Sequence, residues 1–309
     1  MSKVNWWVKV IRKPEYFLQP HRITARIWKW LTNFDYTGFQ TVRLPWGFDL
    51  EVNSEEVVGW SITKSGVHDL SVSEVLWRLQ EPEDVVLDVG ANIGYMTSIM
   101  VYRTGKGGSV YAFEPHPLLF QKLKANINRW QRENIFPYEM ALSSNNKKGL
   151  LYEPTNFAVN QGRASLNESE NSNSTILSKH EIPLVRLDNW YKNDQIIGVM
   201  KVDVENHELQ VFQGSEALLK AQQIRDIIFE DHETYPTPVT SYLERFGYTI
   251  FKLDKGLFGP IARLANAHLQ HYSFDSPSFL ATTQPERVHA RLKSWGWYCL
   301  MSSKLKDLK

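Results

Sequence analysis

The sequence contains little of what marks a secreted or membrane-embedded protein. Its single cysteine, Cys299, excludes an internal disulfide framework and suits a reducing compartment. No apolar run approaches the roughly 20 residues that a membrane-spanning helix needs. Charged residues interrupt Met1–Lys29 too often for the apolar core of a signal peptide. We therefore expect a cytoplasmic protein.

Net charge is small as well, at +1 for the whole chain, but it is unevenly distributed. Residues 1–30 carry seven Lys or Arg against one acid and residues 284–309 carry six against two, which leaves about −9 for the segment between them. Tryptophans accompany the basic ends, namely Trp6, Trp7, Trp28, Trp30, Trp295 and Trp297. Tryptophan beside Lys or Arg is typical of peripheral contact with an anionic membrane, and equally of terminal helices packed as a lid or a homo-oligomer contact. The acidic body argues against a nucleic-acid partner.

Apolar runs and helical patterns alternate along most of the chain of 309 residues. Such alternation predicts parallel strands joined by crossover helices, and near-continuous apolar strands suit a sheet buried on both faces. The predicted strands are Val85–Val89, Val110–Phe113, Tyr138–Leu142, Val199–Val204, Arg225–Glu230, Thr249–Leu253 and Ser278–Thr282, with shorter candidates at Leu150–Tyr152 and Ile182–Val185. The predicted helices are Tyr95–Arg103, Pro117–Arg132, Glu208–Ala221 and Val239–Phe246.

We divide the chain into three parts on this pattern. Residues 1–83 form a helical and β extension, residues 84–283 the α/β domain, and residues 284–309 a basic C-terminal helical tail. Within the domain, residues 143–190 form a long variable loop whose Asn- and Ser-rich tract has too few apolar side chains to offset the entropy lost on ordering. A loop of this length is either a substrate lid or a disordered connector.

The segment Val85–Gly94 carries the clearest functional pattern. An apolar strand runs into a turn with glycines four residues apart, and a helix follows. Gly90 lets the backbone bend sharply and lets a ligand approach closely, because it has no Cβ. Asp88 stands at the strand end, where a carboxylate takes the ammonium group of a bound amino acid, directly or through water. The next strand ends in Glu114, a position from which a carboxylate accepts hydrogen bonds from both ribose hydroxyls.

The spacing of the glycines separates two adenosine cofactors. A dinucleotide fingerprint needs G-x-G-x-x-G, and here Asn92 occupies the position of the middle glycine. This difference disfavours a nicotinamide-dependent oxidoreductase. The G-x-x-x-G spacing, with Asp88 before it and Glu114 after it, favours S-adenosylmethionine.

Several strings resemble the FkbM family of methyltransferases, in the right order and from about Val42 to Thr283. They are LDVGANIGYMTS (87–98), YAFEPHPLLFQKLKANI (111–127), LVRLDNW (184–190), MKVDVENHELQVFQGSEALL (200–219) and DIIFEDHE (226–233). The resemblance implies a Rossmann-like class I methyltransferase sheet with helices on both faces, and O-methylation of a hydroxyl on a glycan, glycolipid or secondary metabolite. By matching positions, the donor S-adenosylmethionine would be held by Asp88, Gly90, Ala91, Asn92, Gly94, Glu114 and Pro115.

One position departs from the family pattern. Asn206 stands where the family has glycine, and Asn is among the few other residues that tolerate a left-handed backbone. We expect the turn to persist, and a non-catalytic protein that has kept the donor pocket is the alternative. The pair His68–Asp69 either folds over the donor or forms a local helix cap.

Acidic residues and histidines follow the fourth and fifth strands of the predicted domain, at the edge where open α/β sheets bind ligands. The catalytic candidates are Asp203, Glu205, His207 and Glu230. In one interpretation an acid or His207 is the general base that removes the hydroxyl proton. In another, Asp203 and Glu230 with a histidine hold a divalent metal such as Mg²⁺ or Mn²⁺. In the third, some acids are solvated or lie in a first helical turn, which we favour for Glu208 and Glu233.

Overall fold

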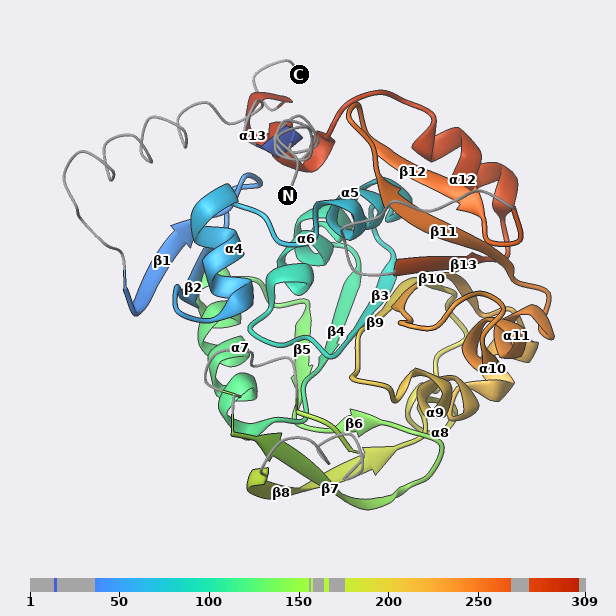
Figure 1. Ribbon diagram of the computed structural model, residues 1–309, viewed down its shortest axis with the longest axis horizontal. Helices are drawn as coiled ribbons and strands as arrows, with labels where there is room; N and C mark the ends of the chain where they lie inside the picture. The colour runs from blue at the N-terminus through green and yellow to red at the C-terminus, as the bar shows by residue number, and fades with distance from the viewer. Residues whose placement is uncertain are drawn as a thin grey trace, which may run out of the picture.

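The computed structural model describes residues 14–15, 37–155, 157, 164–166, 176–267 and 278–305 (Figure 1). A central sheet of eight strands organises these residues. Its strands, in spatial order, are β12 (Pro260–Leu264), β11 (Thr249–Lys255), β13 (Ser278–Thr282), β10 (Ile224–Glu230), β9 (Ile197–Val202), β3 (Val85–Val89), β4 (Ser109–Phe113) and β5 (Ile135–Tyr138). The predicted strands therefore form, although the one predicted over Tyr138–Leu142 is divided between β5 and a separate strand, β6 (Ala141–Leu142).

The strand directions define a doubly wound sheet. Strands β5, β4, β3, β9 and β10 are parallel, and β13 runs antiparallel between β10 and β11. From β3 the chain proceeds outward through β4 and β5, and it then crosses to β9 and β10 on the other side. The order reverses between β3 and β9, and ligands of such sheets bind at the carboxyl ends of the strands beside that switch point. The predicted Rossmann-like sheet is confirmed.

Helices cover both faces of the sheet because alternate strand residues point to opposite sides. In β3, Val86 joins one apolar core, whereas Val85, Leu87 and Val89 join the other. Helices α5 (Leu70–Leu79), α6 (Tyr95–Thr104), α7 (Pro117–Trp130), α12 (Pro285–Leu292) and α13 (Tyr298–Leu305) lie on the Val86 side. Helices α8 (Leu187–Trp190), α9 (Glu208–Gln213), α10 (Glu216–Lys220) and α11 (Pro238–Glu244) lie on the other.

Two additions flank the carboxyl edge of the sheet (Figure 1). A hairpin of β1 (Phe39–Arg43) and β2 (Asp49–Asn53) leads into α4 (Val57–Ser65) and packs against α7. A second sheet has the order β6-β8-β7, with β7 (Lys147–Pro154) antiparallel to β8 (Ile176–Val185). The short strands predicted at residues 150–152 and 182–185 lie within this pair.

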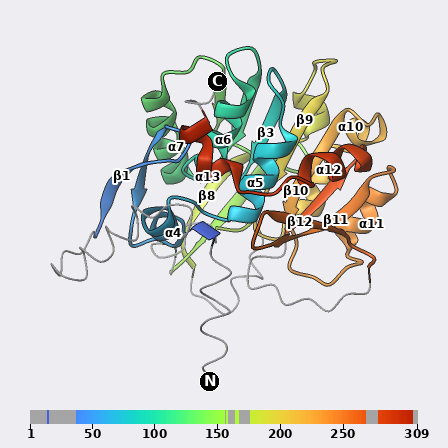
Figure 2. The same cartoon turned by 90° about the horizontal axis from the view of Figure 1, so that it is seen from above.

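The C-terminal segment is fixed against α5, and Figure 2 shows α12 and α13 beside that helix. The buried Glu74 carboxylate accepts hydrogen bonds from the backbone N–H groups of Tyr298 and Cys299, at 2.9 Å each, and pairs with Arg78 at 2.7 Å. Arg78 donates in turn to the carbonyl oxygens of Ser294 and Gly296, at 2.6 Å each. This buried ion pair therefore positions the loop between α12 and α13.

The structure also departs from the sequence prediction in other elements. The helix expected over Glu208–Ala221 is two short helices, because Gly214 packs against another segment: a Cβ there would lie 2.0 Å from the Ser143 carbonyl oxygen. Strand β12 was not predicted. No helix among the described residues is long and apolar enough to cross a membrane.

Candidate active site

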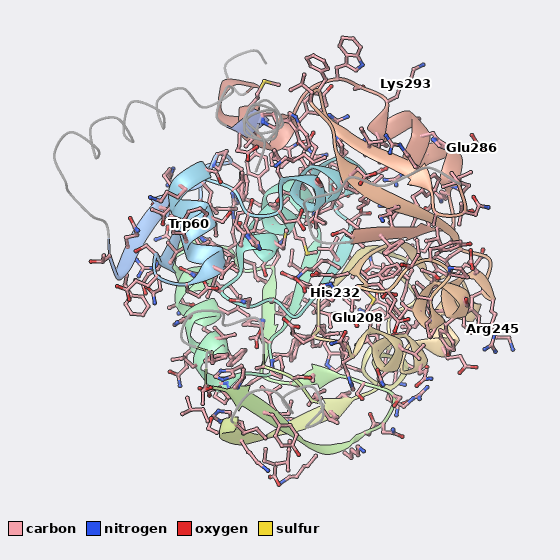
Figure 3. The ribbon with its side chains drawn as sticks, in the orientation of Figure 1. Trp60, Glu208, His232, Arg245, Glu286 and Lys293 are labelled. Atoms are coloured by element: carbon pink, nitrogen blue, oxygen red, sulfur yellow. The ribbon has the colours of Figure 1, made fainter. Side chains whose placement is uncertain are left out.

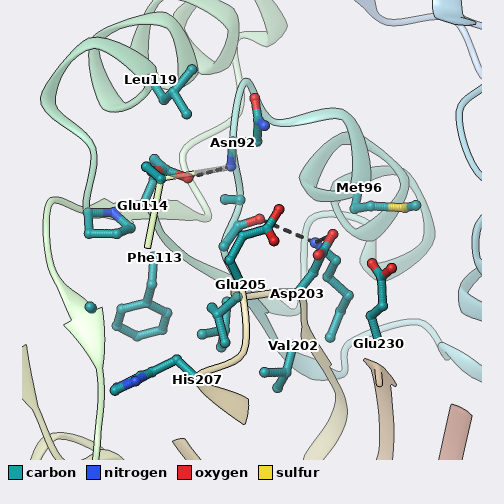
Figure 4. A pocket seen from close by; sticks show the side chains of 18 of the residues that line it. Asn92, Met96, Phe113, Glu114, Leu119, Val202, Asp203, Glu205, His207 and Glu230 are labelled. Atoms are coloured by element: carbon teal, nitrogen blue, oxygen red, sulfur yellow. Dashed lines mark hydrogen bonds and ion pairs between the residues drawn. The ribbon is translucent and has the colours of Figure 1, made fainter. Parts of the chain in front are cut away.

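A cavity of about 460 Å³ opens at the carboxyl ends of β3, β4, β9 and β10 (Figure 4). Residues from α4, from the start of α5 and from the β6-β8-β7 sheet complete its wall. The cavity therefore lies at the switch point of the central sheet, where such sheets bind their ligands.

The glycine turn after β3 forms one wall of the cavity. Gly90, Ala91 and Asn92 line it, and the backbone is left-handed at Gly90 (φ +78°) and at Asn92 (φ +51°). A Cβ at Gly90 would lie 2.0 Å from the Asp203 carbonyl oxygen, so only glycine lets the turns after β3 and β9 approach this closely. Gly94 does not line the cavity: it precedes α6, where a Cβ would meet Leu123 at 2.8 Å.

Glu114 lies at the end of β4, faces the cavity and is followed there by Pro115. One carboxylate oxygen accepts the Asn92 N–H at 2.7 Å, and the other accepts the His116 N–H at 2.8 Å (Figure 4). Burial raises the pKa of Glu114 to about 7, although these two hydrogen bonds lower it. Each carboxylate oxygen has a second lone-pair site, so the group keeps acceptor capacity toward the cavity.

Asp88 lies deeper than the sequence suggested. Its side chain is fully buried, is not among the cavity-lining residues, and accepts a hydrogen bond from the Thr97 hydroxyl at 2.6 Å. The alternation along β3 explains this position, because Asp88 shares the face of Val86 and so lies beneath α6. This arrangement therefore does not offer the direct contact between Asp88 and a ligand ammonium group that the sequence suggested.

Lys201 stands between Asp88 and the cavity, and the sequence analysis missed it. It is the parallel-strand neighbour of Asp88 on β9, it is buried, and it lines the cavity. Its Nζ lies 3.6 Å from Asp88 and 3.1 Å from Asp203, and it donates to the Gly90 carbonyl oxygen at 3.2 Å. Burial would lower the pKa of Lys201, but the carboxylates of Asp203 and Asp88 outweigh it and raise that pKa.

Three of the predicted catalytic acids meet on the side of the cavity formed by β9 and β10. Asp203, Glu205 and Glu230 all line it (Figure 4), and Asn206 keeps the left-handed turn with φ +54°. Burial would raise the pKa of Asp203, but the charge and hydrogen bond of Lys201 outweigh it and lower that pKa. Asp203 is therefore ionised at neutral pH.

The histidine and the other acids that follow β9 and β10 differ in exposure. His207 lines the cavity and its Nε2 lies 3.0 Å from the Ser143 hydroxyl. Glu208 occupies the first turn of α9, as predicted, but it is buried rather than solvated, and burial raises its pKa to about 8. Glu233 is exposed, in agreement with the prediction of a solvated acid.

For the pair His68–Asp69, the sequence left open a place at the donor pocket or a local helix cap, and each residue fits one of the two. His68 lines the cavity, with its ring 6.2 Å from that of Tyr95 in an edge-to-face arrangement. Burial lowers the pKa of His68 to about 4, although the Asp203 carboxylate raises it, so the imidazole is neutral at physiological pH. Asp69 caps α5 by accepting the Val72 N–H at 3.1 Å.

The described residues do not support the predicted metal set of Asp203, Glu230 and a histidine. Asp203 already has the Lys201 ammonium 3.1 Å away, in the region where a cation would bind. The group of three possible ligands among the described residues is instead His116, Glu153 and His180. In His116, Nδ1 accepts the Leu118 N–H at 3.2 Å, so Nε2 carries the proton and points it at Glu153, 3.3 Å away. That nitrogen lacks the free lone pair that a metal needs.

These three side chains connect two parts of the site. His180 also contacts Glu153, at 3.1 Å, and Ser178 donates to the same carboxylate oxygen at 2.8 Å. Because His116 follows Glu114 by two residues, the network ties the β7–β8 pair to the end of β4.

A switch-point cavity with a glycine turn on one side, a buried glutamate after the second strand and acids after the fourth defines the class of S-adenosylmethionine-dependent methyltransferases. The chain belongs to the FkbM methyltransferase family, whose profile, described as the methyltransferase FkbM domain, matches residues 88–250.

Three curated relatives show the same affiliation. The hexuronic acid methyltransferase AglP of Haloferax volcanii is 30% identical over 60% of this chain and 72% of its own length. The 31-O-demethyl-FK506 methyltransferase FkbM of Streptomyces tacrolimicus is 28% identical over 57% and 77%. The 2-O-methyltransferase NoeI of Sinorhizobium fredii is 23% identical over 52% and 70%. The predicted family is confirmed.

Proposed function

We propose that this methyltransferase transfers the methyl group to a hydroxyl oxygen, on a glycan, a glycolipid or a secondary metabolite. The observation that carries the proposal is the placement of Asp203, Glu205 and Glu230 on the cavity wall formed by β9 and β10, next to the donor side at Asn92 and Glu114. Two relatives point the same way, because their names describe O-methylation. A hydroxyl acceptor needs a group that takes its proton, and carboxylates supply one.

The donor side follows from the geometry of β3 and β4. Glu114 would accept hydrogen bonds from the ribose hydroxyls through its remaining lone-pair sites, and the backbone of Gly90–Asn92 would lie along the donor. Asp88 and Gly94 would not contact the donor. Asp88 would hold Lys201 in place, and Gly94 would let α6 and α7 approach each other. Asp88 is thus a positioning residue in this proposal.

The acceptor side would work as follows. The hydroxyl oxygen attacks the methyl carbon, the carbon–sulfur bond breaks, and S-adenosylhomocysteine leaves with both electrons of that bond. The hydroxyl proton passes to a carboxylate in the same step, because an alkyl hydroxyl is too weak an acid to ionise beforehand. Asp203 is the best-placed acceptor of that proton, since Lys201 holds its carboxylate in the ionised form. Glu205, Glu230 and His207 would orient the acceptor molecule.

Thermal unfolding with S-adenosylhomocysteine tests the donor site first. A ligand at about 100 times its dissociation constant adds roughly 2.7 kcal/mol, which raises the midpoint by several degrees. We expect this shift to disappear in Glu114→Ala and to persist in Glu139→Ala, which alters an exposed glutamate outside the cavity. A shift with NADH instead would indicate the oxidoreductase alternative.

Turnover tests the chemistry. With hydroxyl acceptors of the three classes and labelled donor, we expect transfer by the wild type and a rate reduced roughly 100-fold or more in Asp203→Asn, with unchanged affinity for the neutral product S-adenosylhomocysteine. An equal loss of S-adenosylhomocysteine affinity in that variant would instead place Asp203 on the donor side. Donor binding with no transfer to any acceptor would favour the non-catalytic alternative.

A further inference from the structure

A second surface lies apart from the cavity, which we call the apolar tip. It consists of Leu257 and Phe258, in the turn between β11 and β12, and Trp295, in the loop between α12 and α13. Their exposed fractions are 42%, 61% and 80%, and the rings of Phe258 and Trp295 stack with centroids 5.5 Å apart. Single exposed apolar side chains are ordinary, whereas three that gather from two separate loops indicate a binding surface.

The apolar tip is held in place by buried contacts. Gly296 donates its N–H to the Phe258 carbonyl oxygen at 2.7 Å, which joins the two loops. Trp297 is buried, at 1% exposure, and its indole N–H donates to the Leu257 carbonyl oxygen at 3.3 Å. Arg78 anchors the carbonyl oxygens on both sides of Trp295. The fold therefore fixes one tryptophan inward and presents the other outward.

Two lysines lie close to this surface in the chain. Lys293 directly follows the last residue of α12, lies two residues before Trp295 in the chain, and is exposed (Figure 3). The Lys255 ammonium, two residues before Leu257 in the chain, lies 3.5 Å from the Glu15 carboxylate. Residues 1–30 carry a net charge of about +6 and residues 284–309 about +4, on a chain whose remainder is acidic.

We propose that the apolar tip docks on an anionic phospholipid membrane, with Trp295 and Phe258 in the headgroup region. Exposed aromatic side chains beside basic residues match that interface, in which the rings enter the lipid and the cations meet its phosphates. A second copy of the chain fits less well: the tip exposes on the order of 400 Å² of side chain, about half of what each partner contributes to a stable interface.

Vesicle co-sedimentation of the full chain tests this proposal. We expect binding to vesicles of phosphatidylglycerol and phosphatidylcholine, less binding to phosphatidylcholine alone, and loss of binding as salt is raised. The double variant Trp295→Ser with Phe258→Ser should bind roughly tenfold more weakly. Lys293→Glu should lose roughly fivefold or more, because each cation near an anionic surface contributes about that factor.

Trp60 supplies a matched control. It is 53% exposed on α4, with the Lys64 ammonium 5.9 Å from its ring, and it lies on another side of the molecule (Figure 3). Trp60→Ser should leave vesicle binding unchanged, and unchanged thermal midpoints should show that all variants fold. Equal binding to neutral and anionic vesicles, or equal loss in the Trp60 variant, would overturn the proposal. So would a wild-type dimer in light scattering that the tip variants convert to a monomer.

Discussion

Lys201 gives the sharpest test of how the site is held together. Its ammonium lies between a fully buried carboxylate, Asp88, and a carboxylate that faces the cavity, Asp203. Lys201→Met keeps the length of the side chain and removes the charge. Asp203, with 52% of its side chain exposed, can be hydrated after this change. Asp88 cannot, and it keeps only the hydrogen bond from Thr97.

Removing one partner of a buried ion pair costs about 3–5 kcal/mol, because an uncompensated charge remains. Since only one of the two carboxylates stays buried, we expect the lower end, about 3 kcal/mol. Unfolding entropy is roughly 2.1 cal/mol/K per residue, so 309 residues give about 0.65 kcal/mol/K. The thermal midpoint of Lys201→Met should therefore fall by about 5 °C.

The loss should also depend on pH in a defined direction. Burial already raises the pKa of Asp88, and removal of Lys201 raises it further. A carboxyl group with a raised folded-state pKa stabilises the fold at low pH, and that contribution disappears as the pH rises through the folded-state value. The deficit of Lys201→Met should thus be largest near pH 8 and should shrink toward pH 5.

The assay is thermal unfolding followed by circular dichroism at both pH values. Lys201→Met with Asp88→Asn should recover most of the loss, because the second change removes the stranded charge. Lys220→Met, at an exposed position at the end of α10, is the control and should change the midpoint by less than about 1 °C. A deficit of Lys201→Met that is equally small, or the same at pH 5 and pH 8, would refute the assignment of Lys201 as the counter-charge of Asp88.

Three further predictions concern single residues. Affinity for S-adenosylhomocysteine, measured by calorimetry, should fall between pH 8 and pH 6, because the pKa of Glu114 is about 7 and the ionised carboxylate is the stronger acceptor; Glu114→Gln should bind weakly at both. Glu208→Gln should melt higher than the wild type at pH 9 but not at pH 6, since a pKa raised to about 8 means that stability is lost as the pH passes that value. Gly90→Ala should lower both the midpoint and donor affinity, whereas Gly105→Ala, whose added Cβ meets nothing within 4 Å, should cost only the strain of its glycine-favouring backbone (φ +70°, ψ −157°), about 1–3 kcal/mol.

The strands of the central sheet could be predicted because their own residues specify them. A run such as Val85–Val89 is apolar on both faces, and this pattern occurs in few structures other than a covered parallel strand. The glycine turn and Glu114 followed from their positions at strand ends, and both line the cavity. Local patterns were sufficient for these features because neighbouring residues determine them.

Features that depend on distant parts of the chain were not visible in the sequence. Lys201 was not singled out in the sequence, because only the strand register places it beside Asp88. Two sequence signals could have found it: a lone lysine in a buried strand needs a counter-charge, and the alternation along β3 puts Asp88 on the covered face. Likewise Trp295 and Trp297 differ in burial, and the loop that carries them is held by Arg78, which lies more than 200 residues away in the chain.

The acidic residues of the cavity fit a donor that carries a positive charge. Lys201 offsets the buried Asp88, so the charge that faces the cavity from β9 and β10 is that of Asp203, Glu205 and Glu230. A negative wall stabilises the positive sulfonium of the donor and does not stabilise the neutral thioether that remains after transfer. The same acids would therefore strengthen binding of the donor over that of the product.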